Sequence, residues 1–206
     1  MNLISVKPSQ IAEMAFPRLT WRVPGDSKVY LTFDDGPIPE ITEWVLETLA
    51  TYKIQATFFC VGENVEKYPE IFQKILEAEH SVGNHTYNHL NGWKTDCDKY
   101  LENVEKASML IKSHLFRPPH GRIRPSVATK ILKTYKVVMW DVLPKDYDNE
   151  LDPEKCLATV IKKVSKGSII VFHDSIKAEK NMRYTLPKTI DYLIENGYTF
   201  GKLPMQ

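Results

Sequence analysis

Two adjacent carboxylates, Asp34 and Asp35, stand directly after the run 29–33 and directly before Gly36 and Pro37. The run consists of strand-forming residues and a Gly-Pro pair ends a strand, so both carboxylates are expected at the carboxyl end of a core strand. Because side chains alternate along a strand, the two should diverge unless the turn redirects one of them. Neighbouring carboxylates in different environments can take different roles, one binding a metal and one acting as a base. A plain turn that closes a strand is the alternative.

A pair of histidines, His85 and His89, offers metal ligands four residues apart. If this segment turns helically, both imidazoles project from one side and can bind one ion. The alternative is two loop histidines, one of them hydrogen-bonded into the structure. One carboxylate from Asp34 or Asp35 completes a two-histidine, one-aspartate set with open positions, which is the pattern of a catalytic zinc site. A metal there lowers the pKa of bound water, and the second aspartate can take the proton of that water.

The elements that must position these residues alternate between strand and helix along the whole chain. The pattern predicts strands over 29–33, 55–60, 81–84, 114–117, 136–141, 168–172 and 198–200. It predicts helices over 39–52, 63–79, 96–112, 125–135, 153–165 and 186–196, and a short helical turn near 11–15. Such alternation is typical of an α/β protein with a mostly parallel sheet, either a barrel or a doubly wound sheet.

Polar residues follow most of the expected strands. They are Asp34 and Asp35 after the first, His85 and His89 after the third, Arg117 after the fourth, Asp141 and Asp146 after the fifth, and His173 and Asp174 after the sixth. In a parallel barrel the carboxyl ends of the strands share one face, where such folds place their sites. The sequence therefore predicts that residues far apart along the chain converge.

Three of these residues can support the metal chemistry. His173 could protonate a departing nitrogen, or it could be a strand-end histidine bonded to the backbone. Arg117 and Asp146 could orient the base and the acid histidine, although each alone could equally be an ordinary ion-pair residue. Asp174 is interpreted as a helix cap and Asp141 as a strand-end hydrogen-bonding residue.

Five stretches of the chain carry a family resemblance. They are Thr32 to Gly36, His85 to His89, Arg117 to Gly121, Trp140 to Tyr147 and Val171 to His173. In this order they resemble the five motifs of the polysaccharide deacetylases, the NodB-homology group of carbohydrate esterase family 4. The resemblance covers roughly residues 28 to 203, which is nearly the whole chain.

The resemblance implies a distorted (β/α)7 barrel that removes N-acetyl groups from an amino-sugar glycan, such as peptidoglycan- or chitin-like N-acetylglucosamine. It implies one divalent metal ion, zinc in the first place and cobalt or nickel otherwise. The roles it implies are metal binding by Asp35, His85 and His89, general base for Asp34, and general acid for His173 with its pKa set by Asp146. It further implies that Arg117 holds Asp34, that the metal and the backbone N–H of His120 stabilise the oxyanion, and that Tyr147 and Val171 border the acetyl pocket.

Three residues depart from the common pattern of that family. His120 stands where tyrosine is usual, Tyr147 where tryptophan is commoner, and Val171 where leucine is commoner. A backbone N–H survives the first change, although an imidazole can alter substrate contacts or metal behaviour. The other two changes keep an apolar wall but reshape it. The resemblance therefore predicts the type of reaction better than it predicts the acyl group or the sugar of the substrate.

Two other functions remain open at this point. The same fold and metal could act on a small non-sugar amide or a cyclic imide, and Trp93 and Tyr147 are then the residues to examine, because extended glycan grooves carry exposed aromatic rings. An inactive glycan-binding relative is the third hypothesis. Glycoside hydrolysis fits less well, because it needs two carboxyl groups about 5 Å or more apart that flank one bond.

Composition limits the partners. Residues of opposite charge balance at 27 basic and 26 acidic, so no nucleic acid or anionic membrane surface is indicated. No run of about 18 apolar residues occurs, so no membrane span is expected. The three cysteines, Cys60, Cys97 and Cys156, are interpreted as free thiols.

The domain organisation follows from length and from the lead-in. A chain of 206 residues fits one catalytic domain, expected over 28–206, with residues 1–27 as an irregular segment packed on it. Residues 1–20 lack the pattern of a secretory signal, which favours a cytoplasmic location, unless a leader has been removed. We expect a monomer that binds an N-acetylated glycan.

Overall fold

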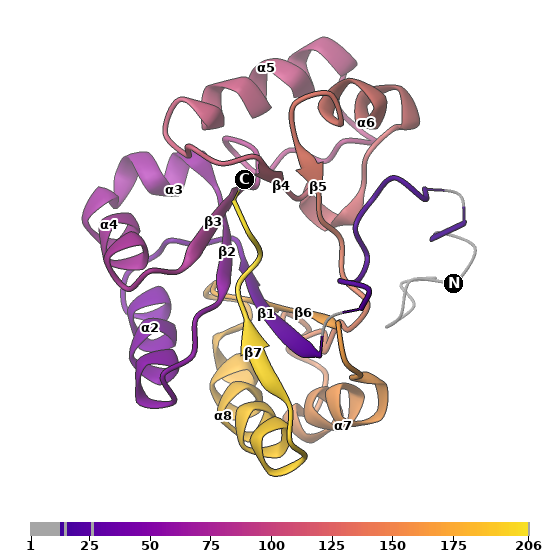
Figure 1. Cartoon of the computed structure of the whole chain (residues 1–206). Helices are drawn as coiled ribbons and strands as arrows, with labels where there is room; N and C mark the ends of the chain where they lie inside the picture. The colour runs from indigo at the N-terminus through magenta and orange to yellow at the C-terminus, as the bar shows by residue number, and fades with distance from the viewer. Residues whose placement is uncertain (1–12, 15, 26, 206) are drawn as a thin grey trace.

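A curved sheet of parallel strands lies at the centre of this computed structural model, which describes residues 13–205 except 15 and 26. The strand order is β5-β4-β3-β2-β1-β6, and β7 pairs with the beginning of β1 (Figure 1). The strands are β1 Lys28–Asp34, β2 Thr57–Cys60, β3 Ser81–Asn84, β4 Leu115–Phe116, β5 Lys136–Val137, β6 Ile169–His173 and β7 Thr199–Gly201. All pairs of strands run parallel, so the carboxyl ends of the main strands meet at one end of the sheet.

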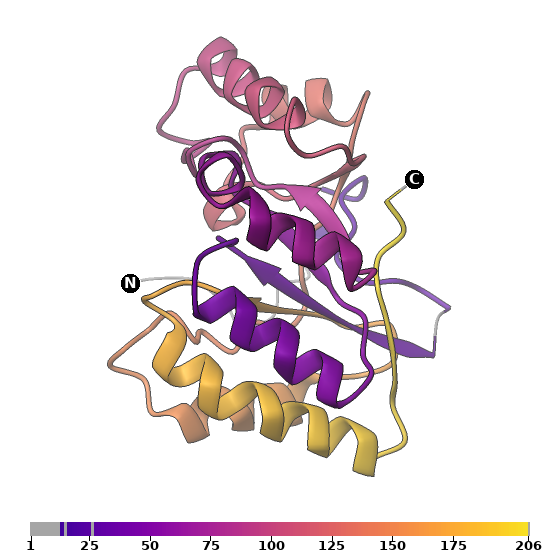
Figure 2. The ribbon, with the colours of Figure 1, turned by 90° about the vertical axis from the view of Figure 1, so that its left-hand side faces the viewer.

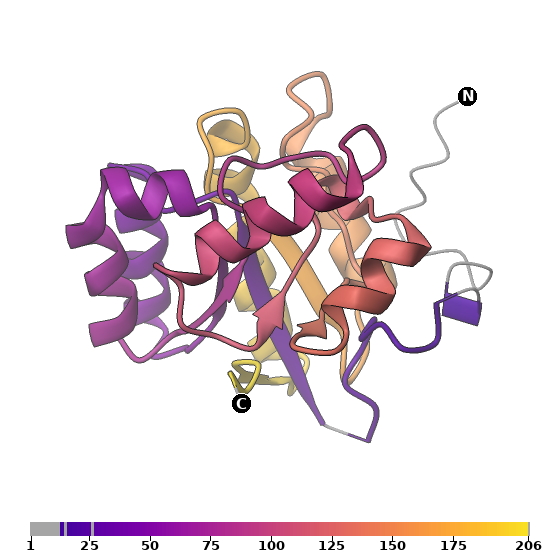
Figure 3. The ribbon, with the colours of Figure 1, turned by 90° about the horizontal axis from the view of Figure 1, so that it is seen from above.

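Helices lie around the outside of this sheet. They are α2 Ile41–Thr51, α3 Gly62–Lys67, α4 Pro69–Glu77, α5 Cys97–Ser108, α6 Pro125–Ile131, α7 Pro153–Lys163 and α8 Glu179–Glu195, with a short 3-10 helix over Pro119–Gly121. Helices α2, α4 and α8 form a layer beside β1 (Figure 2). Helices α5 and α6 cover the part of the sheet that contains β4 and β5 (Figure 3). The arrangement is the expected α/β architecture, a sheet curled into part of a barrel.

Strand β1 shows how the sequence pattern positions the site. Val29, Leu31 and Phe33 are fully buried and pack into the cluster formed with the helices of the α2 and α8 layer. Because successive side chains point to opposite faces, the alternate residues Thr32 and Asp34 face the inside of the barrel. They are 0% and 3% exposed, so polar groups enter the interior at the end of an otherwise apolar strand.

Strands β5 and β6 do not pair with each other, and irregular segments fill the space between them and close the barrel. Thr20 forms a parallel bridge with Val138, and Arg22 forms an antiparallel bridge with Ser168. Leu19 is buried beside them in the cluster under α5 and α6. The part of the 1–27 lead-in that the structure describes therefore fills the gap. The helical turn expected near 11–15 lies mostly outside the described residues.

The largest differences from the sequence prediction concern three elements. The fifth strand is only two residues long instead of reaching residue 141, because beyond Val137 the chain meets its neighbours through single bridges. The helix expected over 63–79 is two helices, since Pro69 cannot continue the first and starts the second. Helix α8 begins at Glu179 rather than 186 and carries Pro187 inside it.

Capping aspartates mark the starts of two helices. Asp96 caps α5 by accepting hydrogen bonds from the backbone N–H groups of Asp98 and Lys99. Asp152 caps α7 in the same way, with Pro153 in the first turn, where proline is tolerated. None of the described helices combines the length and the apolar character that crossing a membrane requires.

Candidate active site

A cavity of about 410 Å³ opens at the carboxyl ends of the strands. The side chains that line it are Asp34, Asp35, His85, His89, His120, Arg122, Trp140, Leu143, Tyr147, His173, Ser175 and Lys177. They come from segments after β1, β3, β4, β5 and β6, so the predicted convergence is observed. Parallel pairing produces it, because each strand delivers its last residue to the same face.

The turn after β1 directs both carboxylates into this cavity. Asp34 is the last residue of β1 and faces inward, and Asp35 adopts a φ of 89° that turns its side chain back toward the same space. The buried Asp174 holds this turn, because its Oδ1 accepts the N–H of Gly36 at 3.1 Å and its Oδ2 accepts the hydroxyl of Thr42 at 2.6 Å. The interpretation of Asp174 as a helix cap was therefore wrong. The divergence that a straight strand would impose on the two carboxylates does not occur.

Replacing Gly36 by alanine is expected to lower the free energy of unfolding by about 2 kcal/mol, within the usual range for overpacking a buried site. A Cβ at Gly36 would lie 1.9 Å from Oδ2 of Asp174, and that carboxylate is held by two hydrogen bonds and cannot withdraw freely. Urea unfolding followed by circular dichroism measures the change. Gly25→Ala is the comparison, because nothing lies within 4 Å of that position and only its positive φ opposes a side chain. An unchanged midpoint for Gly36→Ala would contradict the crowding.

A loop, and not a helical turn, brings the two histidines together. The helical turn that the four-residue spacing required is therefore not present in this segment. Thr86 and His89 both have positive φ angles, 66° and 57°, so the loop reverses sharply. The Asn84 side chain supports it by accepting the N–H of Thr86 at 2.8 Å. The imidazole centres of His85 and His89 are 5.2 Å apart. The loop therefore places the two imidazoles side by side, as a helical turn would have done.

His85 is oriented as a metal ligand. Its Nδ1 lies 2.8 Å from the carbonyl oxygen of Arg117, so Nδ1–H donates to that carbonyl and the lone pair of Nε2 faces the cavity. Burial lowers the pKa of His85 to about 4, although the charge of Asp34 opposes the shift. A neutral imidazole is the form that binds a metal.

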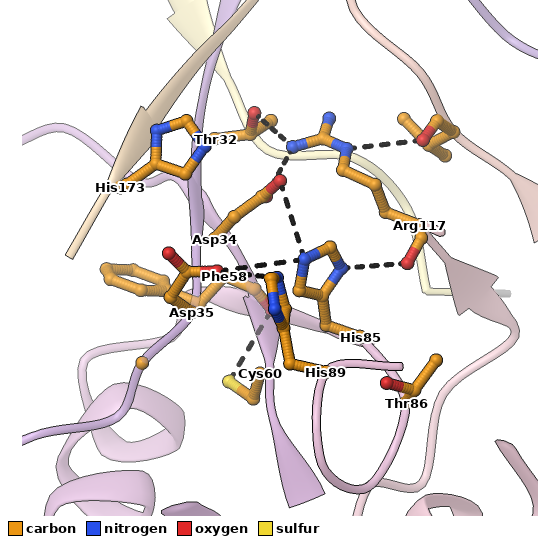
Figure 4. Close-up of polar contacts among 12 residues, drawn as sticks. Thr32, Asp34, Asp35, Phe58, Cys60, His85, Thr86, His89, Arg117 and His173 are labelled. Atoms are coloured by element: carbon orange, nitrogen blue, oxygen red, sulfur yellow. Dashed lines mark hydrogen bonds and ion pairs between the residues drawn. The ribbon is translucent and has the colours of Figure 1, made fainter. Parts of the chain in front are cut away.

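Asp35, His85 and His89 fit a divalent metal ion. One ligand atom from each lies within 4.8 Å of the others (Figure 4). Oδ1 of Asp35 is buried and receives no hydrogen bond of suitable geometry, and it lies 3.2 Å from Nε2 of His89. Burial acts to raise the pKa of Asp35, but the close contact with His89 and the charges of His173 and His85 hold it well below its usual range. One carboxylate and two imidazoles suit zinc and other first-row divalent ions.

Asp34 is held by a buried arginine rather than by the ligand cluster. Nη1 of Arg117 donates to Oδ1 of Asp34 at 2.6 Å and to the hydroxyl of Thr32 at 2.8 Å (Figure 4). The same guanidinium donates to the carbonyl oxygens of Val138 and Met139. Arg117 is 0% exposed, so the carboxylate is fixed by a charge that water does not screen. The second oxygen of Asp34 lies 3.9 Å from Nε2 of His85, on the side of the metal ligands.

His173, the last residue of β6, is paired with a buried carboxylate. Nδ1 of His173 donates to Oδ1 of Asp146 at 2.8 Å, and the backbone N–H of His173 donates to Oδ2 at 2.7 Å. Burial lowers the pKa of His173, but the charge and hydrogen bond of Asp146 and the charges of Asp35 and Asp34 outweigh it and raise the pKa to about 9. The imidazole therefore carries a proton at neutral pH and has Nε2 available for the cavity.

The remaining predicted residues lie at or near the cavity wall. His120 has its ring edge-on to His89, with 4.6 Å between ring centres, and Tyr147 stands edge-on to His173 at 4.9 Å. Val171 is fully buried in β6 and is not among the lining residues. Trp93 is 57% exposed and lies beside the lining residue Arg122.

Sequence reasoning missed several lining residues. They are Arg122, Trp140, Leu143, Ser175 and Lys177. Trp140 lies within the predicted strand 136–141, and the other four follow a predicted strand closely, so their position near strand ends was the available signal. The strand-end residue Asp141, which was singled out, binds the hydroxyl of Ser168 and the N–H of Ile169 and lies outside the lining.

Sequence comparisons with known proteins identify the family of the chain. Residues 22–140 match the family described as polysaccharide deacetylase. The chain is 32% identical to a peptidoglycan-N-acetylglucosamine deacetylase of Bacillus cereus over 191 residues, which cover 88% of this chain and 89% of the relative. It is also 32% identical to a chitooligosaccharide deacetylase of Bradyrhizobium over 161 residues, covering 74% and 73%.

A solved structure extends the similarity to three dimensions. The crystal structure of the Bc1960 peptidoglycan N-acetylglucosamine deacetylase, in complex with a substituted N-oxidanyl-benzamide, superposes with a TM-score of 0.85 at 30% identity. The match covers 91% of each chain. The motifs, the curled sheet and the shared sequence all agree. The chain belongs to the polysaccharide deacetylases, the NodB-homology group of carbohydrate esterase family 4, and is a hydrolase of N-acetyl amide bonds.

Proposed function

We propose that this chain removes N-acetyl groups from an amino-sugar glycan, peptidoglycan- or chitin-like, by metal-dependent hydrolysis. One observation carries the proposal. A carboxylate fixed by Arg117, an imidazole protonated by its pairing with Asp146, and a three-ligand metal site share one cavity. Together they supply the base, the acid and the electrophile that amide hydrolysis requires.

Asp35, His85 and His89 would hold the ion. When bound, such an ion would supply a water of lowered pKa and a positive charge beside the acetyl carbonyl. Asp34 accepts the proton of the attacking water, because Arg117 holds one of its oxygens and leaves the other directed to the cavity. Water oxygen bonds to the acetyl carbon and the carbon–nitrogen bond breaks, which yields acetate and an amine.

The leaving nitrogen requires a proton. His173 donates it from Nε2, while Asp146 holds Nδ1 and stabilises the protonated ring. The backbone N–H of His120 is proposed to stabilise the oxyanion. Leu143, Trp140 and Tyr147 form the apolar part of the wall, where the acetyl methyl group is expected to lie.

Asp146→Asn is expected to move the alkaline limb of the kcat/KM profile down by about one to three pH units, the usual effect of an opposite charge on a pKa. The pKa of His173 lies above its ordinary value because Asp146 outweighs burial, so without that charge burial lowers it. The donating form exists below the pKa and is lost as the pH rises through it. As the pH rises, the variant therefore loses its activity at a lower pH than the unaltered protein does. Steady-state rates between pH 6 and pH 10 measure the limb.

The control for this variant is Asp148→Asn, a neighbouring carboxylate whose Oδ1 accepts the N–H of Glu150. Among the described residues, the ion pair of His173 and its hydrogen bonds to a carboxylate go to Asp146 and not to Asp148. Its profile should coincide with that of the unaltered protein. If the alkaline limb of Asp146→Asn also coincides, His173 is not the acid.

Acetate release tests the proposed function directly. The purified protein, stripped of metal and then loaded with zinc, cobalt or nickel, is incubated with N-acetylglucosamine oligomers and peptidoglycan fragments. Acetate that depends on the metal supports the proposal and identifies the preferred ion. A protein that binds one ion and releases no acetate would overturn it, and small amides and cyclic imides would then be the substrates to assay.

A further inference from the structure

Two cations line the cavity and have no part in the proposed reaction. They are Arg122, in the segment after β4, and Lys177, in the segment after β6. Each stands against an aromatic ring, since the Arg122 guanidinium lies 5.2 Å from the centre of Trp93 and Nζ of Lys177 lies 5.8 Å from the centre of Tyr147. Among the described residues, no carboxylate forms an ion pair with either cation. Both charges are therefore available to a ligand.

The aromatic partner of Arg122 is held in place although it is exposed. Nε1–H of Trp93 donates to the carbonyl oxygen of Ile123 at 3.3 Å, and the Trp93 carbonyl accepts a hydrogen bond from Arg124 at 2.9 Å. The ring nevertheless remains 57% exposed. A fixed, uncovered indole offers an apolar face for a sugar ring at little entropic cost.

The charge balance of the cavity favours an anion. Among the described residues, the carboxylates of the lining are Asp34 and Asp35, and a bound divalent ion would match their two formal charges. Arg122 and Lys177 then leave an excess of positive charge around the opening. Such an excess attracts and orients anionic ligands.

We infer that Arg122 and Lys177 select for an amino-sugar glycan that carries carboxylates beside the acetylated sugar. Trp93 and Tyr147 would stack on the sugar rings while the cations bind the carboxylates. The inference rests on the proposed function and narrows its substrate class. A neutral N-acetylglucosamine oligomer can use the aromatic rings but leaves both cations without a partner.

The test compares two substrates that differ only in charge. One is an oligosaccharide of N-acetylglucosamine and N-acetylmuramic acid with free carboxylates, and the other is the same compound with those groups converted to amides. The ratio of kcat/KM for the two should be about ten in the zinc-loaded protein, as two partly exposed ion pairs predict, and should fall as sodium chloride is added. Arg122→Gln and Lys177→Gln should each lower this ratio about threefold, and the double variant should bring it close to one.

Matched controls come from α8. Lys188 lies over the ring of Tyr184 at 5.0 Å and Arg183 lies over Trp44 at 4.8 Å, both outside the cavity lining. Lys188→Gln and Arg183→Gln should leave the ratio unchanged. A ratio near one in the unaltered protein, or an equal fall in these controls, would overturn the selection while the deacetylase activity stands. If neither substrate released acetate, the result would instead contradict the proposed function, and the inference that rests on it would also be wrong.

Discussion

Replacing Asp34 by asparagine is expected to lower kcat for acetate release by about 10³-fold, within the range for removing a general base, while the metal remains bound. The amide can still accept the hydrogen bond from Arg117, so the shape of the site is kept, but it cannot take a proton from water. The proposed metal ligands are Asp35 and the two histidines, so this change removes none of them. Acetate assays and metal analysis on the same sample measure both properties.

The neighbouring variant Asp35→Asn is the natural control for this result. It should lose the metal as well as the activity, because Asp35 supplies the only carboxylate of the ligand cluster. The same substitution at two adjacent aspartates would then have different effects: Asp34→Asn would lose activity alone, and Asp35→Asn would lose both activity and metal binding. If Asp34→Asn retains more than a tenth of the activity, or loses the metal, the assignment of the base is wrong.

Replacing Arg117 by methionine is expected to lower the free energy of unfolding by about 3–5 kcal/mol, the usual cost of leaving one member of a buried ion pair uncompensated. Arg117 is fully buried and binds Asp34, Thr32 and two backbone carbonyl groups, so its removal leaves several polar groups without a donor. Activity should fall as well, because Asp34 loses the contact that orients it. Urea unfolding and acetate release measure the two effects.

A double-mutant cycle separates the ion pair from the rest of the network. If the charge pair dominates, Arg117→Met should cost less in the Asp34→Asn background than in the unaltered protein. Arg183→Met is the comparison, because Arg183 pairs with Glu179 one helical turn away in α8 where both side chains are partly exposed, and this pair should contribute less than about 1 kcal/mol. Equal costs for Arg117→Met and Arg183→Met would contradict the proposed importance of burial.

Much of the fold could be predicted from local patterns. Strand β1 was predicted because its apolar and β-branched residues end at a Gly-Pro pair, and α5 because its apolar residues recur at helical spacing. The strand and helix alternation predicted parallel pairing, and parallel pairing brings strand ends together. The family follows from the order of motifs at those ends. These features depend on residues close together in the chain, so sequence reasoning could reach them.

The geometry of the site depended on contacts that local patterns do not contain. Asp34 and Asp35 face one cavity because Asp174, far along the chain, holds the turn between them. His85 and His89 meet through a loop of left-handed residues, which no periodicity predicts. Likewise, the sequence pattern did not predict where β5 ends or where α8 begins.

The sequence by itself determined which side chains this protein has for its chemistry and the order in which the strands present them. Only the tertiary structure decided their charge states and orientations. Burial keeps the imidazole of His85 neutral, and the pairing with Asp146 makes His173 a cation, although both are histidines at strand ends. The physical reason is that a pKa and a side-chain direction are set by the groups that surround a residue in space, and folding brings those groups from distant parts of the chain.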